Sequence, residues 1–300
     1  MSVTGLTVGI VGLPNSGKST LFNALLKRQI AQVGEYPYTT IEPNVGVVEV
    51  PDKRLEKIAN ILKISKKVPA AIKFIDIAGL IKGAHKGEGL GNQFLGHIRE
   101  VDAICHVVRA FENPNVEHIG GRIDPEVDVE VVNDELFKAE IDKPTLYIIN
   151  VSESDLNKNY DTVFPYIKIC AKLEVELSEL SGEEQKSYLA ELGVDPSTGL
   201  SLSQIIKESY KLLDLITFFT IVGGKMVQAW PVKRTTKMVE AAEIVHTDFA
   251  KGFIAAEIID WQKLVDSGSW TSAKENGLIK TVGRDEEIVD GLVVEFKSSI

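Results

Sequence analysis

The chain has 300 residues, of which 44% are hydrophobic and 25% are charged, so it can bury a sizeable core and form about two domains. Its net charge of −10 argues against broad, non-specific binding to nucleic acid but leaves room for a local basic face. No apolar run reaches the roughly 18 residues of a membrane span, and the first residues lack the basic start and apolar core of a signal peptide. We therefore expect a cytoplasmic protein with no membrane association.

The first two-thirds of the chain alternates short apolar runs with helical patterns. The strand-like runs cover residues 7–11, 45–50, 71–77, 103–108, 145–149 and 164–170. Continuous apolar strands separated by helices form a mostly parallel sheet with both faces covered. We therefore expect an α/β fold whose nucleotide loops lie at the carboxyl ends of the strands. The two cysteines, Cys105 and Cys170, lie inside such runs, which predicts buried free thiols and a reducing compartment.

Residues 12–20 form the most informative motif. They read Gly-Leu-Pro-Asn-Ser-Gly-Lys-Ser-Thr, between an apolar strand and a helix that opens at Lys18. In such a loop, backbone N–H groups close on the β- and γ-phosphates, Lys18 reaches the same oxygens, and the Ser19 hydroxyl is placed for Mg²⁺. The motif predicts a nucleotide site. Its predicted binding residues are Asn15, Ser16, Gly17, Lys18, Ser19 and Thr20.

Two further segments are typical of a nucleotide switch. The strand that ends at Asp76 is followed by Gly79, so we expect Asp76 to hold the Mg²⁺ shell through water and the Gly79 N–H to meet the γ-phosphate. Upstream, the proline-punctuated loop 36–44 carries two threonine hydroxyls, one of which can reach Mg²⁺ when the γ-phosphate is present. The alternative for this loop is an ordinary turn with Ser/Thr hydrogen bonds.

The choice of base depends on residues 150–153, Asn-Val-Ser-Glu, which directly follow a strand. This position resembles the guanine-reading Asn-Lys-x-Asp segment of GTPases. Here Val151 replaces the lysine and Glu153 replaces the aspartate, so the two-acceptor fit to guanine is lost and adenine is the better prediction. A polar strand-to-loop junction without a ligand is the alternative.

The group that orients the attacking water is not evident from the motifs. Leu80 stands where many GTPases carry a glutamine. His85 and Glu88, in the glycine-rich segment 81–92, are two candidates for the role, and His118, in the loop 112–118, is a third. Each histidine alone is more often a solvated loop residue.

The carboxyl-terminal domain is expected to begin near Leu215, after a helix over residues 202–213, with a strand at 218–222 punctuated by Gly223-Gly224. Basic and aromatic residues interleave there: Lys225, Trp230, Lys233, Arg234, Lys237, Lys251 and Phe253. Such a patch can bind an RNA backbone or stack on bases. A solvated rim around a small β core is an equal alternative.

Taken together, these motifs resemble the Obg-like ATPase family, YchF type, of the TRAFAC class of P-loop NTPases. The resemblance is carried by residues 12–20, 38–44, 76–80 and 86–95, by Asn150 with Glu153, and by 246–254, which is similar to the core of a TGS domain. It implies an Obg-type G domain over residues 1–214 and a small β-grasp (TGS) domain over residues 215–300.

The resemblance also implies functional roles. It implies a preference for ATP, association with the large ribosomal subunit, and a regulatory role linked to redox state or translation. It implies Mg²⁺ ligands at Ser19 and Thr40, adenine contacts from Asn150, Val151 and Glu153, and a potassium ion held by Asn15. It places His118, ahead of His85, at the position of a histidine proposed to act in hydrolysis.

The chain departs from the family in two places. Relatives carry a long helical hairpin after the segment matching 131–136, whereas here a strand follows almost at once, and only about a dozen residues join Asn150 to the next strand. We expect the hairpin to be missing or truncated near 136–143 and the crossover helix to be missing or stunted.

The resulting interpretation is a slow, Mg²⁺-dependent ATPase that switches between two conformations, in which Lys18, Gly79 and His118 act on the γ-phosphate. A GTPase of the Obg type and a non-hydrolysing, nucleotide-dependent adaptor for RNA or the ribosome remain as alternatives. A monomer is the default oligomeric state.

Overall fold

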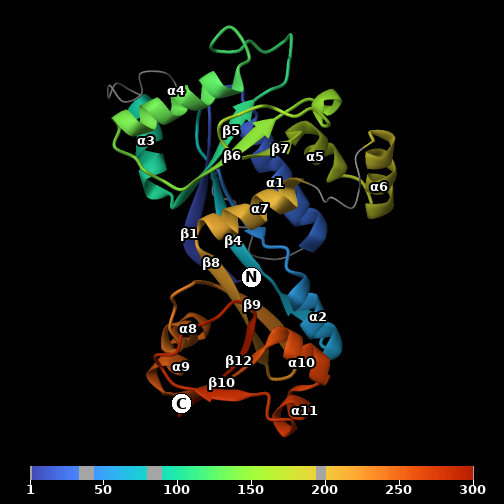
Figure 1. The fold of residues 1–300 in the computed structure, drawn as a ribbon, viewed down its shortest axis with the longest axis vertical. Coiled ribbons are helices and arrows are strands. Elements are labelled where there is room, and N and C mark those ends of the chain that lie inside the picture. The colour runs from blue at the N-terminus through green and yellow to red at the C-terminus, as the bar shows by residue number, and fades with distance from the viewer. Residues whose placement is uncertain (1, 34–43, 80–89, 194–200, 300) are drawn as a thin grey trace. The chain divides into compact units, whose positions relative to one another are not determined.

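The computed structural model describes residues 2–33, 44–79, 90–193 and 201–299. The chain folds into two compact units, each with its own sheet. The first, which we call the sheet-A unit, comprises Gly5–Val48 and Ile72–Leu213. The second, the sheet-B unit, comprises Met1–Thr4, Glu49–Ala71 and Asp214–Ile300, so it is assembled from segments far apart in the sequence (Figure 1).

Sheet A has six strands in the order β2-β4-β1-β5-β6-β7. Their bounds are β1 Ser2–Val11, β2 Val45–Glu49, β4 Ala70–Asp76, β5 Ala103–Arg109, β6 Thr145–Asn150 and β7 Tyr166–Ile169. The pairs β1·β5, β5·β6 and β6·β7 are parallel. All six strands occur where apolar runs predict them, and the predicted α/β fold with a mostly parallel sheet is confirmed.

Helices cover both faces of sheet A (Figure 1). They are α1 Lys18–Val33, α3 Leu90–Glu100, α4 Pro125–Lys138, α5 Ala171–Leu177, α6 Gly182–Glu191 and α7 Ser201–Leu212. Helix α4 begins at Pro125 because the Asp124 side chain accepts a hydrogen bond from the Val127 N–H and proline suits the first helical position. One core cluster joins apolar residues of β1 and β5 to residues of α3 and α4, including Ile104, Ile98 and Val132.

The two predicted reductions are confirmed in the described chain. Helix α4 ends at Lys138 and β6 begins at Thr145, which leaves no room for a helical hairpin between them. Between β6 and β7 the only regular element is a single 3₁₀ turn, η2 (Glu153–Asp155). Tyr166 orders this connection, because its hydroxyl accepts from the Tyr160 N–H at 3.0 Å and donates to the Tyr160 carbonyl at 3.1 Å.

Sheet B has the order β11-β10-β12-β8-β9-β3. Its strands are β3 Lys66–Val68, β8 Leu215–Val222, β9 Met226–Lys233, β10 Phe253–Asp260, β11 Lys280–Val282 and β12 Leu292–Ser298. The helices of this unit are α2 Lys53–Ile61, α8 Met238–Val245, α9 Thr247–Lys251, α10 Trp261–Ser267 and α11 Trp270–Glu275. Gly223 and Gly224 both have positive φ, which the tight β8–β9 turn requires, since two such residues match the twist of a hairpin.

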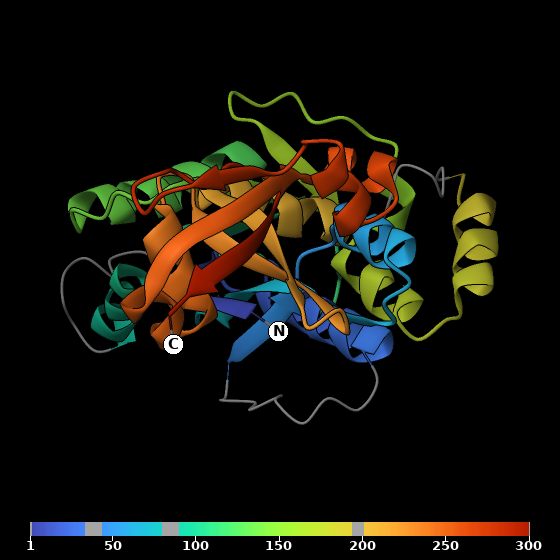
Figure 2. The same cartoon turned by 90° about the horizontal axis from the view of Figure 1, so that it is seen from below.

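The segment 49–71 leaves sheet A after β2 and returns to it as β4. Within it, β3 pairs in parallel with β9, and α2 packs on α10 (Figure 2). Arg54 fixes this segment: its guanidinium bonds Asp52 and, at 2.7 Å, Asp290, whose other oxygen accepts from the Thr217 N–H. No local pattern in the sequence indicates this excursion, because its partners lie in the last third of the chain.

Both cysteines are free and buried, as predicted. No described helix is long and apolar enough to cross a membrane.

Candidate nucleotide site

The phosphate loop lies between β1 and α1, and its glycines are required by their surroundings. Gly12 has φ +149°, and a Cβ there would lie 2.3 Å from the Val107 carbonyl oxygen. Gly17 has φ +95°, and a Cβ there would lie 2.2 Å from Asn150 Nδ2. Residues with a side chain rarely adopt these φ values, and neighbouring atoms occupy the positions that a Cβ would take. Glycine at both positions therefore holds the loop in one conformation and leaves its backbone free to approach a ligand.

Lys18 is the cation of the loop. Its side chain is buried, and Nζ donates to the Leu13 carbonyl oxygen at 2.9 Å. Burial lowers the pKa of Lys18 to about 8, while the nearby Asp76 carboxylate partly offsets that shift. A charge desolvated in this way gains much from a phosphate, since the electrostatic attraction is stronger out of water.

The remaining loop residues present polar groups of different exposure. Ser16 is buried, and its hydroxyl has no hydrogen-bond partner within the described structure. Ser19 and Thr20 are exposed in the first turn of α1. Asn15 has φ +64°, and its Nδ2 donates to the Glu117 carbonyl oxygen at 3.3 Å. The loop thus contacts the segment that follows β5.

Asp76 and Gly79 lie beside the phosphate loop. Asp76 is the last residue of β4, and its buried Oδ1 has no hydrogen-bond partner among the described residues. A Cβ on Gly79 would lie 3.0 Å from the Pro14 nitrogen and 3.1 Å from Lys18 Nζ. An unpartnered carboxylate oxygen near a loop cation suits a hydrated Mg²⁺ ion. The predicted ligand Thr40 and the candidates His85 and Glu88, with Leu80, lie outside the described residues.

Asn150 joins three parts of the site. Its Nδ2 donates to the Ser16 carbonyl oxygen at 3.0 Å, and its Oδ1 accepts from the Ala171 N–H at 3.0 Å. Asn150 itself is buried at the end of β6. The amide therefore ties the phosphate loop to the start of α5, and both of its functional groups are used inside the protein.

The other two predicted base contacts differ in exposure. Val151 is 2% exposed and packs in a core cluster with Cys170 and Leu173. Glu153 lies in η2 with its side chain 31% exposed, and its carboxylate is 3.9 Å from Lys172 Nζ. Of the two, Glu153 has the side chain placed to reach a ligand. Adenine contacts from Val151 and Glu153 remain predictions.

Sequence reasoning missed the segment 170–172, which supplies the Ala171 N–H to Asn150 and Lys172 to Glu153. It follows β7, and the carboxyl end of a parallel strand next to β6 is the signal that could have found it. Arg109 was also missed, although it is a charged residue that ends a buried strand and is 2% exposed.

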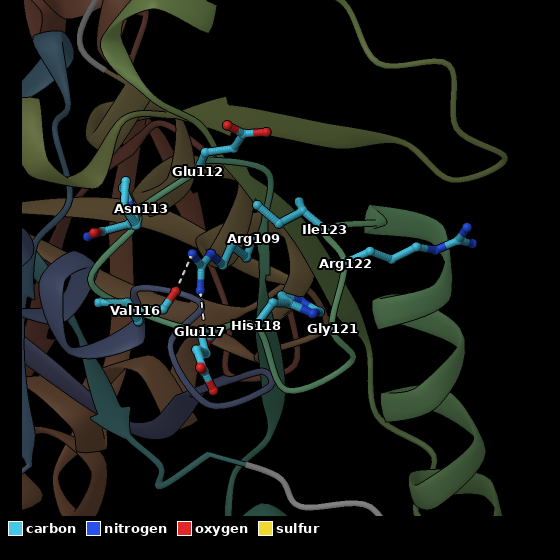
Figure 3. Close-up of a pocket in the computed structure, with 10 residues that line it drawn as sticks. Arg109, Glu112, Asn113, Val116, Glu117, His118, Gly121, Arg122 and Ile123 are labelled. Atoms are coloured by element: carbon cyan, nitrogen blue, oxygen red, sulfur yellow. Dashed lines mark hydrogen bonds between the residues drawn. The ribbon is translucent and has the colours of Figure 1, made fainter.

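Arg109 organises the loop after β5 (Figure 3). Its guanidinium donates to the carbonyl oxygens of Phe111, Val116 and Glu117 at 3.1, 2.9 and 3.3 Å, and it lies over the Phe111 ring. The Glu117 carbonyl is the same one that accepts from Asn15. A buried guanidinium with three backbone acceptors fixes the course of this loop against the phosphate loop.

His118 is held by both of its ring nitrogens. Nε2 lies 2.9 Å from Asp128 Oδ2, and Nδ1 accepts from the Gly120 N–H at 3.1 Å. Both side chains are 6% exposed. Because a nitrogen that accepts carries no proton, this pairing defines the neutral ring with its hydrogen on Nε2, donated to Asp128.

A cavity of about 810 Å³ opens beside this loop. Its lining residues all belong to the chain from Arg109 to Ile123 and include His118, Glu117 and Arg122 (Figure 3). None of them belongs to residues 12–20, so the cavity adjoins the phosphate loop and is not the phosphate site itself. Asp76, Gly79 and Asn150 lie beside the phosphate loop, and together these residues form the candidate nucleotide site.

A parallel sheet with a glycine-bounded phosphate loop, a strand-terminal aspartate and a strand-terminal asparagine defines a P-loop nucleotide-binding protein with the GTPase fold. A family model described as "50S ribosome-binding GTPase" matches residues 7–151. A model for the C-terminal region of YchF GTPases, described as a protein of unknown function, matches residues 215–299. Together with the relatives below, these matches establish that the chain belongs to the YchF family.

Relatives match over the whole chain. "Ribosome-binding ATPase YchF" of Bacillus subtilis is 40% identical over 369 residues, covering 98% of this chain and 100% of the relative. The protein of the same name in Haemophilus influenzae is 37% identical over 372 residues, covering 99% and 100%. Both alignments are longer than this chain, so the relatives carry residues that have no counterpart here.

Solved structures agree with the fold. "Structure of the Schizosaccharomyces pombe YchF GTPase" superposes with a TM-score of 0.83 at 30% identity and covers 97% of each chain. A GTP binding protein from Pyrococcus horikoshii superposes with a TM-score of 0.59 at 17% identity, covering 98% of this chain and 100% of that one, which is a likeness of fold alone. The printed names of the relatives differ on the nucleotide, ATP or GTP.

Proposed function

We propose that this chain is a Mg²⁺-dependent ATPase that binds the ribosome and changes conformation with the nucleotide it carries. The observation that carries the proposal is Asn150, which bonds the phosphate loop at Ser16 and the start of α5 at Ala171. This arrangement brings the base-reading segment and the phosphate loop into one site. The name of the whole-length relatives, ribosome-binding ATPase, supports both halves of the proposal.

Phosphate binding falls to backbone N–H groups of residues 15–20 and to Lys18. The Ser19 hydroxyl is exposed and Asp76 has an unpartnered oxygen, so both fit a hydrated Mg²⁺ ion, with Thr40 as a further proposed ligand. When bound, Mg²⁺ neutralises charge that develops on the phosphate oxygens. The proposed potassium ion would be held by the side-chain oxygen of Asn15, whose Nδ2 donates to the Glu117 carbonyl.

Hydrolysis would rest on positioning. Lys18 and the Gly79 N–H stabilise the γ-phosphate, and His118 orients the attacking water. Turnover should be slow, because Leu80 replaces the usual glutamine and no described arginine reaches over the phosphate loop as an arginine finger does. A non-hydrolysing adaptor is the competing function, and phosphate release at the background rate would favour it.

The preference for ATP rests on Glu153. Guanine recognition needs a free carboxylate for two hydrogen bonds, whereas Glu153 is paired with Lys172 and is one carbon longer than aspartate. A GTPase remains the second candidate, since the S. pombe relative is titled a GTPase.

Competition between ATP and GTP, measured by calorimetry with Mg²⁺ and potassium present, tests the preference. We expect ATP to bind at least about tenfold tighter. A Glu153→Asp/Lys172→Ala variant, which shortens and frees the carboxylate, should move the preference toward GTP, and Lys168→Ala on β7 is the matched control. Val151 should be left unchanged, because a lysine there would enter the core. Tighter GTP binding by the unaltered chain would overturn the argument.

The ribosomal partner is proposed to be the large subunit, with RNA contact through the C-terminal domain. There, Lys225, Lys233, Arg234, Lys237 and Lys251 are all exposed. Phe253 is 7% exposed in the core of the unit and Trp230 bonds Thr220, so we assign RNA contact to the basic side chains alone. Co-sedimentation with separated subunits tests the choice: association with the large subunit should weaken as salt rises, and association with the small subunit alone would contradict it.

We further propose a G domain of residues 1–214 and a TGS domain of residues 215–300, with the excursion 49–71 packed in the same compact unit as the latter. A cytoplasmic location and a monomeric state complete the proposal. Light scattering at assay concentration measures the oligomeric state.

A further inference from the structure

We infer that Asp128 is a positioning residue for hydrolysis: its carboxylate fixes His118 in the neutral form whose proton is on Nε2, which leaves Nδ1 as the nitrogen that accepts a hydrogen bond from the attacking water. The inference rests on the proposed function, because it assigns His118 to the water. It adds a residue on α4 that no sequence motif marks.

The hydrogen bond on the buried side of the His118 ring is expected to persist. Nε2 and Asp128 Oδ2 are 2.9 Å apart, and each side chain is only 6% exposed. Burial raises the pKa of Asp128, and the hydrogen bond and charge of His118 partly offset that shift. A buried carboxylate without its partner would be costly, so this contact should persist while the loop changes around it.

The other side of the ring is exchangeable. Nδ1 accepts from the Gly120 N–H, and Gly120 is exposed in a turn closed by Gly121, whose N–H bonds the His118 carbonyl at 2.9 Å. An exposed backbone N–H can bond solvent water at little cost, so a water molecule can take its place at Nδ1. Gly121, with φ +75°, gives this turn a conformation that few other residues adopt.

The ring is also placed next to the phosphate loop. Glu117, the preceding residue, accepts from Asn15 through its carbonyl, and Arg109 holds that same carbonyl. His118 lines the cavity of about 810 Å³ that adjoins the phosphate loop, and this cavity is ample for a water molecule (Figure 3). In the reaction the water oxygen bonds to phosphorus, the bond to the β-phosphate oxygen breaks, and the water proton ends on the released phosphate.

Two further charged groups act on this pair. Asp124 precedes α4 and raises the pKa of Asp128, while Arg109 at the end of β5 lowers it. Within the described residues, neither is hydrogen-bonded to the His118 ring or to the Asp128 carboxylate, so the His118–Asp128 bond is the direct contact to test.

The test measures ATP hydrolysis and ATP affinity for Asp128→Ala, Asp128→Glu, His118→Ala and the double variant. Asp128→Ala should lower kcat about ten- to a hundredfold, by analogy with the loss when the carboxylate that orients a metal-bound histidine is removed, and should change the ATP Kd less than about twofold. Asp128→Glu should recover part of kcat. The double variant should be no slower than His118→Ala, because both residues act through one ring. Asp134→Ala, an exposed acid on the same helix, is the matched control.

A second readout is independent of turnover. The ring ¹⁵N shifts of His118 distinguish the protonated nitrogen, and we expect a hydrogen on Nε2 in the unaltered chain and a mixture of tautomers in Asp128→Ala. An unchanged kcat in Asp128→Ala overturns the inference. So does a faster kcat, which would mean that the carboxylate withholds His118 from the water. If the unaltered chain does not hydrolyse ATP, the proposed function fails, whereas the ¹⁵N shifts still decide whether Asp128 sets the tautomer.

Discussion

The phosphate loop and the loop after β5 adjoin each other but are held in different ways. In the phosphate loop the constraint is on the backbone: Gly12 and Gly17 fill spaces that admit no side chain. In the loop after β5 the constraint comes from side chains, because Arg109 holds the carbonyls of residues 111, 116 and 117 and Asp128 holds the His118 ring. The conformation of the phosphate loop is therefore specified by its own glycines, whereas the placement of His118 depends on side chains that the folded loop and α4 bring together.

The largest expected effect breaks the phosphate loop alone. Gly17→Ala would place a Cβ 2.2 Å from Asn150 Nδ2 at φ +95°, and such strain costs about 1–3 kcal/mol before the clash is counted. We expect ATP affinity to fall about a hundredfold or more by calorimetry. Gly96→Ala, where a Cβ would meet nothing within 4 Å, should bind ATP normally. Normal binding by Gly17→Ala would mean that the loop is not held as described.

A second prediction concerns α5, which packs on α1, the helix that opens in the phosphate loop. Burial raises the pKa of Glu174 to about 7; the Leu202 N–H bonds one carboxylate oxygen and the other has no partner among the described atoms. A raised carboxyl pKa favours the neutral form, so folding stability should fall as pH rises from about 4.5 to about 7 and then level off. Glu174→Gln cannot ionise, so it should avoid this loss in the free energy of unfolding, which is about 3 kcal/mol at pH 8.

Urea unfolding at pH 5 and pH 8 checks this expectation. The advantage of Glu174→Gln should be about 1 kcal/mol at pH 5 and largest, about 3 kcal/mol, at pH 8, while Glu183→Gln, an exposed acid on α6, should behave as the unaltered chain at both values. An advantage that is equal at both pH values would exclude the titration of Glu174 as its cause.

Arg109→Met breaks the side-chain-held loop and leaves the phosphate loop intact. Loss of the guanidinium leaves the carbonyls of Phe111 and Val116 without this hydrogen-bond donor, although the Glu117 carbonyl keeps its bond from Asn15. We expect hydrolysis to fall about tenfold and ATP affinity to change less than about threefold. Faster amide hydrogen exchange over 112–118 should accompany the loss. Arg122→Met, whose side chain is 75% exposed, is the matched control. An equal fall in affinity would show that the two loops are one unit.

The smallest predicted effect is the uptake of a proton when ATP binds. With the Lys18 pKa near 8, about half of the free protein carries a neutral Lys18 at pH 8, and a bound phosphate should keep it charged. ATP binding should therefore take up about half a proton at pH 8 and almost none at pH 6.5. Calorimetry in two buffers of different ionisation heat measures the uptake. Lys18→Arg, which stays charged, should abolish it.

The sequence was sufficient wherever the signal is local. The six strands of sheet A, the phosphate loop, Asp76 and Gly79 were all predicted, because apolar runs and a glycine motif act over a few residues. The shortened connection before β6 was predicted by comparison with the family that the motifs resemble, and the one after β6 from its length.

What the sequence did not reveal depends on contacts that no motif marks. The bond between His118 and Asp128 joins a loop to the helix that follows it, and the pairing of β3 with β9 joins segments in different thirds of the chain. Val151 was predicted from its place in a motif, but its burial is set by α5, which the motif does not contain.

The excursion 49–71 also bears on the order in which the protein can fold during synthesis. All residues of the sheet-A unit have been made once Leu213 leaves the ribosome, so that unit can close early. The segment 49–71 cannot complete its packing at that stage. Strand β3 pairs with β9, and Arg54 bonds Asp290 near the end of the chain, so both partners are made later. A nascent chain would thus hold a completed nucleotide site while residues 49–71 are still without their partners.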